Sequence, residues 1–381
     1  MNKRIAIIGA SDLQLPLIEK AKQMGYETHV FAWAAGDVGE KAADVFYPIS
    51  ITEIDKITDQ CREIKPAAIA SIASDLAAIT VNRVANALGL PANPPETAII
   101  ATNKYEMRKT FREAGLPVPL FYKVGAEDDL SEVRRMKLPI IVKPTDRSGS
   151  RGIYKLTSFD ELQDAVLQSC SESFEHKAIV EEYIEGEEYS CECVSQNGIH
   201  HFLALTKKFT TGAPHFIEIG HMEPSGLDEE TCEKVKGQVF RALDALHVQC
   251  GASHSEFKVD PVSGGIRLIE IGARMGGDCI GSDLVYLSTG YDFVKMVIQA
   301  AAGQPVSLVK EKHADAAAVR YVMNRQDYED FLALKQHNPD AIFRMSDIHY
   351  EEKEVSDSSQ RYGFYIATGS SDVGLRQLLH L

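Results

Sequence analysis

The sequence predicts a mixed fold, with an α/β part at the N-terminus followed by a larger α+β part. Over about the first 95 residues, strand-like and helix-like segments alternate at the spacing typical of a parallel sheet. From about residue 100, runs of strands stand beside runs of helices, which indicates an antiparallel sheet. The cluster Pro91, Pro94 and Pro95 breaks the first pattern and marks a boundary. A chain of 381 residues is too long for one small core and suits two or three domains.

The N-terminal elements follow from apolar periodicity. We expect strands over 4–9, 28–33 and 67–73, with one helix over 13–24 and another that ends at residue 87. The turn at Gly9 lacks the second and third glycines of the G-x-G-x-x-G fingerprint, so close approach of a pyrophosphate is disfavoured. The pattern therefore predicts a Rossmann-like structural half, or a surface for a small substrate at the strand ends.

The α+β part is expected to begin with a helix over 102–113. Further strands are predicted over 139–143, 152–156, 178–183, 189–194 and 200–206, with a helix over 160–170. A long helix over 228–247 precedes a hairpin of strands 251–260 and 266–271. The tail carries strands over 316–323 and 362–367 and ends in a short helix. We find no internal repeat and no low-complexity segment.

Composition excludes several classes of function. Lys and Arg number 40 against 55 Asp and Glu, and the net charge of −15 argues against a nucleic-acid-coating or membrane-surface protein. No apolar stretch reaches the ~20 residues that span a bilayer, and the run 5–10 is too short for a signal peptide. The seven cysteines include no C-x-x-C pair, which is typical of a reducing cytoplasm. Cys191 and Cys193 would share one strand face, where packing is favoured over a metal site.

Two loops carry residues suited to a nucleotide. The strand that ends in Lys143 is followed by a Ser/Gly/Arg loop that reaches Gly152. Its backbone amides could fold over phosphates, with the lysine as a point charge beside them. An apolar strand also ends in the acidic turn 181–188, whose carboxylates can accept hydrogen bonds from a ribose and an adenine amino group. Taken singly, each loop is also compatible with a solvated surface.

The predicted hairpin places two carboxylates opposite each other. If the turn 261–265 is bracketed evenly, antiparallel pairing sets Glu256 opposite Glu270 on one face. Like charges directly opposite each other destabilise a sheet, and Mg²⁺ between them removes that penalty. The alternatives are a register shifted by one residue, or neutralisation by Lys258 and Arg267.

The segment Glu270-Ile-Gly-Ala-Arg-Met-Gly-Gly-Asp278 follows the hairpin. Its glycines allow close approach of a ligand, and the Arg274 guanidinium suits two-point contact with phosphate or carboxylate, although an exposed arginine in a cap loop is the alternative. Together with the loops and the hairpin, this segment points to a nucleoside triphosphate. The Walker-A motif and the protein-kinase motif set are both missing, so those two classes are excluded.

In their order and spacing these pieces resemble the ATP-grasp superfamily over essentially the whole chain. The resemblance implies an N-terminal Rossmann-like domain over 1–98, a hinge helix and ATP-binding lid over 99–190, a central catalytic subdomain over 191–311 and a C-terminal subdomain over 312–381. It also implies ATP and Mg²⁺ as cofactors, with Mn²⁺ as the alternative metal.

The resemblance further implies a set of site residues. Lys104 and Lys143 would be the two phosphate-binding lysines, and the mobile glycine-rich loop would contribute Arg147, Ser148, Gly149, Ser150 and Gly152. Glu181, Glu182 and Ile184 would contact the adenine, and Glu188 the ribose. Glu256 and Glu270 would be the metal carboxylates, but the asparagine common in the family two positions later is Gly272 here.

Within the superfamily, the stretch 270–274, the segment 214–224 and the tail 361–369 are most similar to the L-amino acid ligases, which join two amino acids. The similarity implies an ATP-dependent carboxylate–amine ligase that forms a C–N bond through an acyl phosphate. Arg274 would contact the transferred phosphoryl group. His221 would orient the substrate or help the amine to lose its proton, unless its role is structural. We expect small-molecule substrates, no nucleic-acid or membrane partner, a cytoplasmic location and a homodimer.

Two other functions stay open. One is a carbamoyl-phosphate- or purine-pathway-like enzyme that acts on bicarbonate or a ribonucleotide. A ribonucleotide would demand basic residues near the N-terminal strand ends, where few occur. The other is a non-catalytic ATP-binding regulator, for which Gly272 is the argument.

Overall fold

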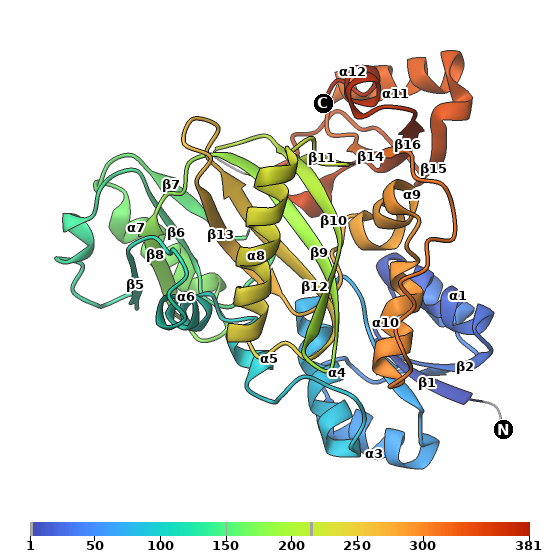
Figure 1. Cartoon of the computed structure of the whole chain (residues 1–381). Coiled ribbons are helices and arrows are strands. Elements are labelled where there is room, and N and C mark those ends of the chain that lie inside the picture. The colour runs from blue at the N-terminus through green and yellow to red at the C-terminus, as the bar shows by residue number, and fades with distance from the viewer. Residues whose placement is uncertain (1–2, 150, 214–215) are drawn as a thin grey trace.

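The computed structural model describes residues 3–149, 151–213 and 216–381 and builds them on three sheets (Figure 1). A parallel sheet of strand order β3-β2-β1-β4 lies at the N-terminus. An antiparallel sheet of order β5-β8-β6-β7 follows, and the largest sheet has the order β13-β12-β9-β10-β11-β14-β16-β15. The mixed α/β and α+β fold predicted from the sequence is therefore confirmed.

The N-terminal sheet is made of short apolar strands buried by helices. Its elements are β1 (Lys3–Ile8), α1 (Leu15–Gln23), β2 (Tyr26–Phe31), α2 (Val38–Ala42), β3 (Val45–Tyr47), α3 (Ile54–Ile64), β4 (Ala68–Ala70) and α4 (Asp75–Leu88). The run Ile5–Ile8 is fully buried, as expected for a strand covered on both faces. The segment α2–β3–α3 was not predicted. Its strand is too short to show periodicity, but α3 buries Ile57, Cys61 and Ile64 at helical spacing, and this signal was overlooked.

The turn after β1 is filled by a side chain of the chain itself. Gly9 has a φ of +105°, and the buried Gln14 packs directly against it. The Gln14 amide accepts a hydrogen bond from the backbone N–H of Ile72 at 3.1 Å and donates one to its carbonyl. This side chain occupies the place beside Gly9 where a dinucleotide would need backbone approach, in agreement with the missing glycines.

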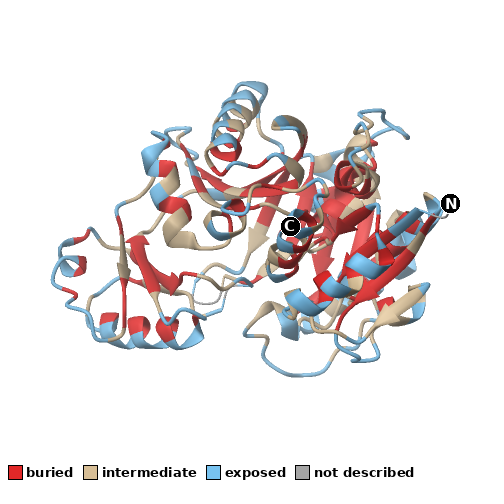
Figure 2. Ribbon diagram, turned by 90° about the horizontal axis from the view of Figure 1, so that it is seen from below, coloured by how far each residue is buried: buried red, intermediate tan, exposed pale blue. Residues whose placement is uncertain are grey.

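The second sheet forms a small lobe with its own core. It consists of β5 (Phe121–Val124), β6 (Ile140–Pro144), β7 (Tyr154–Leu156) and β8 (Ala178–Glu182), with α7 (Leu162–Glu172) packed on it. Figure 2 shows this lobe as a buried patch apart from the larger one. The helices α5 (Thr97–Ile100) and α6 (Lys104–Glu113) precede it. Helix α6 begins later than predicted because the Asn103 side chain caps it, accepting from the backbone of Tyr105 and Glu106 at 3.1 Å each.

The large sheet is covered on its two faces by different helices. Its first strands are β9 (Glu187–Gln196), β10 (Ile199–Thr210), β11 (Glu218–Glu223), β12 (Cys250–Val259) and β13 (Ile266–Gly272). Helix α8 (Glu229–Ala245) packs over Cys191 and Cys193, which are fully buried, and this supports the packing interpretation of the two thiols. Helix α10 (Phe293–Ala301) packs on the other face and joins the sheet to the N-terminal core.

The C-terminal strands extend this same sheet. They are β14 (Ala316–Tyr321), β15 (Ile342–Met345) and β16 (Phe364–Gly369), accompanied by α11 (Arg325–His337) and α12 (Asp372–Leu378). A π-helical turn, Ile280–Leu284, and the short helix α9 (Val285–Thr289) link β13 to α10. No helix in the described part of the chain is long and apolar enough to cross a membrane. The division into four subdomains stays a prediction.

Candidate active site

The hairpin of β12 and β13 sets Glu256 opposite Glu270, as the sequence predicts. The premise of that prediction is off by one residue. An evenly bracketed turn would pair Asp260 with Ile266, whereas the structure pairs Val259 with Ile266. A register irregularity directly after Glu256 compensates for the shift and restores the pairing of the two carboxylates.

Lysines from other elements balance these carboxylates. Lys208 of β10 contacts Glu256, and Lys104 of α6 lies 3.1 Å from Glu270. The alternative of neutralisation by Lys258 and Arg267 is wrong. Those two side chains donate instead to the hydroxyl of Tyr183 at 3.1 Å and to the carbonyl of Ile266 at 3.0 Å.

Most of the predicted site residues line one cavity of about 410 Å³. They are Lys104, Lys143, Arg147, Ser148, Gly149, Glu181, Ile184, Glu188, His221, Glu256, Glu270 and Arg274. Gly152 and Glu182 do not line it. The Gly152 carbonyl accepts from the Ser169 hydroxyl at 2.7 Å, and the Glu182 carboxylate accepts from the Leu120 N–H at 3.3 Å. Ser150, Pro214 and His215 lie outside the described residues.

The wall formed by the small lobe is a buried ion-pair network. Glu181 contacts Lys143 at 2.5 Å and Arg108 at 2.8 and 3.2 Å. Burial alone would raise the pKa of Glu181, but these two cations lower it to about 2. Both carboxylate oxygens of Glu181 are thus engaged with cations, which differs from the predicted contact with an adenine amino group. Glu181 instead fixes the position of the Lys143 ammonium.

The loop after β6 is tied to α6 and to the turn before β8. Lys104 donates to the backbone carbonyl of Arg147 at 2.7 Å. The Asp146 carboxylate accepts from the backbone N–H groups of Phe174 and Glu175 at 3.0 and 2.9 Å. The Arg147 guanidinium lies 4.6 Å from the ring centre of Phe174. The start of the loop is therefore anchored beside both predicted phosphate-binding lysines.

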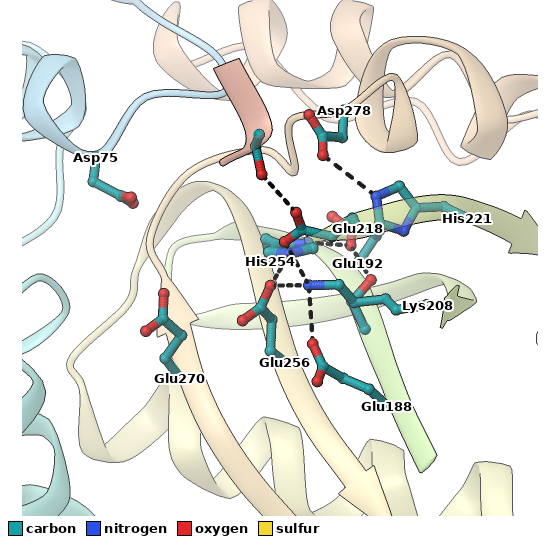
Figure 3. A network of polar contacts seen from close by, with 12 residues as sticks. Asp75, Glu188, Glu192, Lys208, Glu218, His221, His254, Glu256, Glu270 and Asp278 are labelled. Atoms are coloured by element: carbon teal, nitrogen blue, oxygen red, sulfur yellow. Dashed lines mark hydrogen bonds and ion pairs between the residues drawn. The ribbon is translucent and has the colours of Figure 1, made fainter. Parts of the chain in front are cut away.

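Lys208, which the sequence reading missed, lies among three carboxylates of the large sheet (Figure 3). Its ammonium contacts Glu256 and lies 3.3 Å from Glu188 and 4.0 Å from Glu218. Burial opposes the charge, yet the carboxylates raise the pKa of Lys208 well above its usual value. The strand predicted from the sequence ended at residue 206. Extending it by two residues would have placed Lys208 on the same face as Thr206.

His254 joins Glu256 to a second buried carboxylate. Its Nδ1 lies 2.5 Å from Glu192 and its Nε2 lies 3.3 Å from Glu256. Burial would lower the pKa of His254, but the two carboxylates raise it to about 9. The imidazole is therefore charged at neutral pH and holds Glu256 in place. The spacing His254-x-Glu256 on one strand was the available signal.

Arg274 is held by a residue of the N-terminal helix α4. Its guanidinium makes a two-point contact with Asp75, at the start of α4, at 2.7 and 3.2 Å. The loop Ala73–Leu76 that carries Asp75 lines the cavity, in agreement with a surface at the strand ends. A Cβ atom at Gly272 would lie 3.1 Å from both Arg274 and Asp75. The glycine that departs from the family pattern therefore leaves room for this ion pair, and a larger residue would press on both side chains.

His221 belongs to a cluster that reaches the C-terminal tail. Its Nε2 lies 3.5 Å from Asp278, and Arg361 lies 3.1 Å from Asp278 and 2.8 Å from Glu218. Although burial opposes it, the His221 hydrogen bond and the Arg361 charge lower the pKa of Asp278. Glu218 and Asp278 lie in the stretches 215–221 and 274–282, which the sequence suggested as the lining of the acceptor pocket, but neither they nor Arg361 were named individually. Arg361 is separated from Asp278 by 83 residues, so no local pattern could pair them.

Glu256 and Glu270 fit the needs of Mg²⁺. Both are oxygen donors on neighbouring strands and both line the cavity. No group of three or more His, Cys, Asp or Glu side chains arranged for a metal occurs within residues 3–149, 151–213 and 216–381. The chain would therefore supply these two ligands, and phosphate oxygens or water would complete the shell.

Comparison with known proteins agrees with this geometry. Residues 136–283 match the family model of the ATP-grasp domain. The carbamoyl phosphate synthase large chain of Thermotoga neapolitana is 28% identical over 209 residues, which are 53% of this chain and 19% of that protein. The alanine–anticapsin ligase of Bacillus subtilis is 29% identical over 217 residues, 50% of this chain and 44% of that protein. The chain thus spans between a fifth and a half of these relatives.

Two solved structures share the fold. The L-amino acid ligase of Bacillus licheniformis superposes with a TM-score of 0.83 at 22% identity and covers 100% of this chain and 96% of that one. The N5-carboxyaminoimidazole synthetase of Staphylococcus aureus, complexed with ADP, gives 0.78 at 17% identity, with 100% and 98% covered. Residues 136–283 are therefore an ATP-grasp domain, within a chain whose whole fold is that of the L-amino acid ligase structure.

Proposed function

We propose that the protein is an ATP-dependent carboxylate–amine ligase that acts on amino acids and releases ADP and phosphate. The observation that carries this proposal is one cavity that gathers Lys104, Lys143 and Arg274 with the paired Glu256 and Glu270. Three cations suited to phosphate next to two carboxylates suited to Mg²⁺ are what phosphoryl transfer from a nucleotide requires. The ATP-grasp domain supports ATP and Mg²⁺ as the cofactors.

At the nucleotide end, the predicted roles stay with the residues named above. Lys143, fixed by Glu181, and Lys104, fixed by Glu270, would contact phosphate oxygens. The loop that starts at Arg147 would cover the phosphates and exclude water, which otherwise hydrolyses an acyl phosphate. Ile184 and Glu188 line the cavity where the adenine and the ribose are predicted.

The chain can support both chemical steps. In the first, a substrate carboxylate oxygen forms a bond to the γ-phosphorus as the bond to ADP breaks, and Arg274 would stabilise the transferring group. In the second, the amine nitrogen forms a bond to the acyl carbon as the carbon–oxygen bond to phosphate breaks. An ammonium must give up two protons. His221 would take the first, and the leaving phosphate the second.

The regulator alternative loses its main support. Gly272 lies beside the Arg274–Asp75 pair and leaves room for it, which gives this glycine a structural reason. The free, mostly buried cysteines support a cytoplasmic location. The net negative charge of the chain supports small-molecule substrates rather than a nucleic-acid partner. A homodimer remains part of this proposal.

The decisive measurement is release of ADP and phosphate from MgATP with pools of amino acids. Release that depends on an amino acid supports the ligase. Release that depends only on bicarbonate would favour the carbamoyl-phosphate-like alternative. ATP that binds tightly and is not turned over with any substrate would contradict the proposed function.

A further inference from the structure

Phe174 is an exposed aromatic residue next to a cation of the candidate active site. It lies between α7 and β8, is 66% exposed and is not among the described residues that form the core of the small lobe. The Arg147 guanidinium lies 4.6 Å from the centre of its ring, within the ~6 Å range of a cation–π contact. Arg147 also lines the cavity. The contact therefore joins a surface ring to the start of the predicted phosphate-binding loop.

The backbones of the two residues are fixed on either side of this contact. The Asp146 carboxylate accepts from the backbone N–H of Phe174 at 3.0 Å and from the Ser173 hydroxyl at 2.8 Å. The Lys104 ammonium donates to the backbone carbonyl of Arg147 at 2.7 Å. These bonds place the ring and the guanidinium next to each other before any ligand binds.

Arg147 is held differently from the cavity cations described above. Those cations each pair with a carboxylate at 3.1 Å or less, and they are Lys104, Lys143, Lys208 and Arg274. The one ion pair of Arg147 within the described residues is with Glu172 at 3.7 Å, which is longer than a hydrogen bond. An aromatic ring attracts a guanidinium without accepting a conventional N–H···O hydrogen bond. The planar N–H donors of Arg147 therefore stay available to a phosphate group.

We propose that Phe174 is the positioning residue of Arg147, and that its ring holds the guanidinium ready to contact the phosphates of the nucleotide. The inference rests on the proposed function, which puts those phosphates at this end of the cavity. Arginine is among the side chains that lose the most rotamer freedom when they are ordered. Because the ring restricts Arg147 in advance, less of this freedom is lost when the nucleotide binds. Phe174 thus strengthens phosphate binding without touching the nucleotide.

Binding of MgAMP-PNP, an ATP analogue that is not hydrolysed, tests this inference without turnover. Calorimetric titration of the whole chain would compare wild type with Phe174→Leu, Phe174→Tyr, Arg147→Ala and the double variant of Phe174→Leu with Arg147→Ala. Leucine keeps an apolar side chain but has no ring, whereas tyrosine keeps the ring. Adenosine is the second ligand, because it lacks phosphates. Leu167→Ala is the matched control, since Leu167 is 45% exposed on α7 of the same lobe and does not line the cavity.

We expect Phe174→Leu to weaken MgAMP-PNP binding roughly twofold to fivefold, which corresponds to an exposed cation–π contact. Phe174→Tyr should restore the affinity. Arg147→Ala should weaken binding roughly tenfold to a hundredfold, the loss expected for a charge-assisted hydrogen bond. In the Arg147→Ala background, Phe174→Leu should cause no further loss, because the ring then has no guanidinium to hold. Adenosine affinity should be the same in all variants and in the control.

Equal losses for Phe174→Leu in the presence and absence of the arginine would overturn the inference, because Phe174 would then act independently of Arg147. Parallel losses of adenosine and MgAMP-PNP affinity would also overturn it, since they would show general damage to the lobe, as would a loss in the Leu167→Ala control. The proposed function fails separately. The expected losses together with no amino-acid-dependent ADP release from MgATP would support the role of Phe174 and contradict the ligase.

Discussion

Lys143 and Lys208 are both buried beside the cavity, but their surroundings shift their pKa values in opposite directions. Burial lowers the pKa of Lys143, with Arg108 and Lys104 nearby and Glu181 opposing. Burial also acts on Lys208, but three carboxylates outweigh it and raise the pKa. The wall from the small lobe thus has a surplus of cations, and the wall from the large sheet has a surplus of carboxylates. The first suits phosphates, and the second suits Mg²⁺.

The largest expected effect removes one carboxylate of the second wall. Glu270→Gln keeps the shape of the side chain and a hydrogen-bond acceptor for Lys104, so the fold should persist. It removes a charge needed for Mg²⁺, so amino-acid-dependent ADP release should be abolished. The assay is steady-state ADP release at saturating MgATP, with the melting temperature as the control for folding. Activity above roughly a tenth of wild type would contradict the metal assignment of Glu270.

The next effect concerns Arg274, the cavity cation that pairs with Asp75. Arg274→Lys keeps the charge but loses the planar two-point geometry, so kcat should fall by roughly 10²–10³ with little change in the KM for ATP. Steady-state kinetics at saturating Mg²⁺ would measure both. An unchanged kcat with a raised KM for the amino acid would move Arg274 from phosphoryl contact to carboxylate recognition.

Removing the anion of the first wall should act mainly on stability. Glu181→Gln leaves Arg108 and Lys143 buried without their counter-charge, which typically costs ~3–5 kcal/mol. Urea unfolding of the variant and wild type would give the difference in free energy. Glu182→Gln is the neighbouring control, since Glu182 is partly exposed and accepts a single backbone hydrogen bond at 3.3 Å. Equal losses for the two variants would contradict a special role for the buried pair.

The smallest effect tests whether Glu223, a buried carboxyl group of the large sheet, is protonated in the folded protein. Burial raises the pKa of Glu223 to about 8, and hydrogen bonds from Ser288 and Thr206 oppose this only in part. Between pH 4.5 and about 8 the folded state therefore holds a proton that the unfolded chain has lost, so stability falls as pH rises. Glu223→Gln should flatten this slope, by at most ~1.4 kcal/mol per pH unit. Urea unfolding at pH 5 and pH 8 measures it, and equal slopes would show that Glu223 is ionised in the fold.

The sequence predicted what is encoded locally. Lys143 ends a buried strand and is followed at once by its loop, and Glu256 and Glu270 are joined by a short hairpin, so neighbouring residues determine their arrangement. Even there, the predicted pairing of Glu256 with Glu270 is correct only because the one-residue error at the turn is compensated by the register irregularity after Glu256.

Other parts depend on contacts between distant segments. Asp75 reaches Arg274 across 199 residues, and Lys208 reaches Glu256 across 48. The hydrophobic pattern of a single sequence does not show which distant residues form such pairs. The strand β3 was missed for a different reason, because a strand as short as Val45–Tyr47 is fixed by pairing with β2 rather than by its own pattern. The helix α3 could have been predicted, since Ile57, Cys61 and Ile64 recur at helical spacing.

The narrow space beside Gly272 also predicts which residues should vary together among related sequences. Because a side chain there would press on the Asp75–Arg274 pair, we expect changes at the two positions to be linked. Among relatives, a larger residue at the place of Gly272 should occur together with a smaller or uncharged residue at the place of Asp75. Residues at the start of α4 and at the end of β13, nearly two hundred positions apart, would then change together.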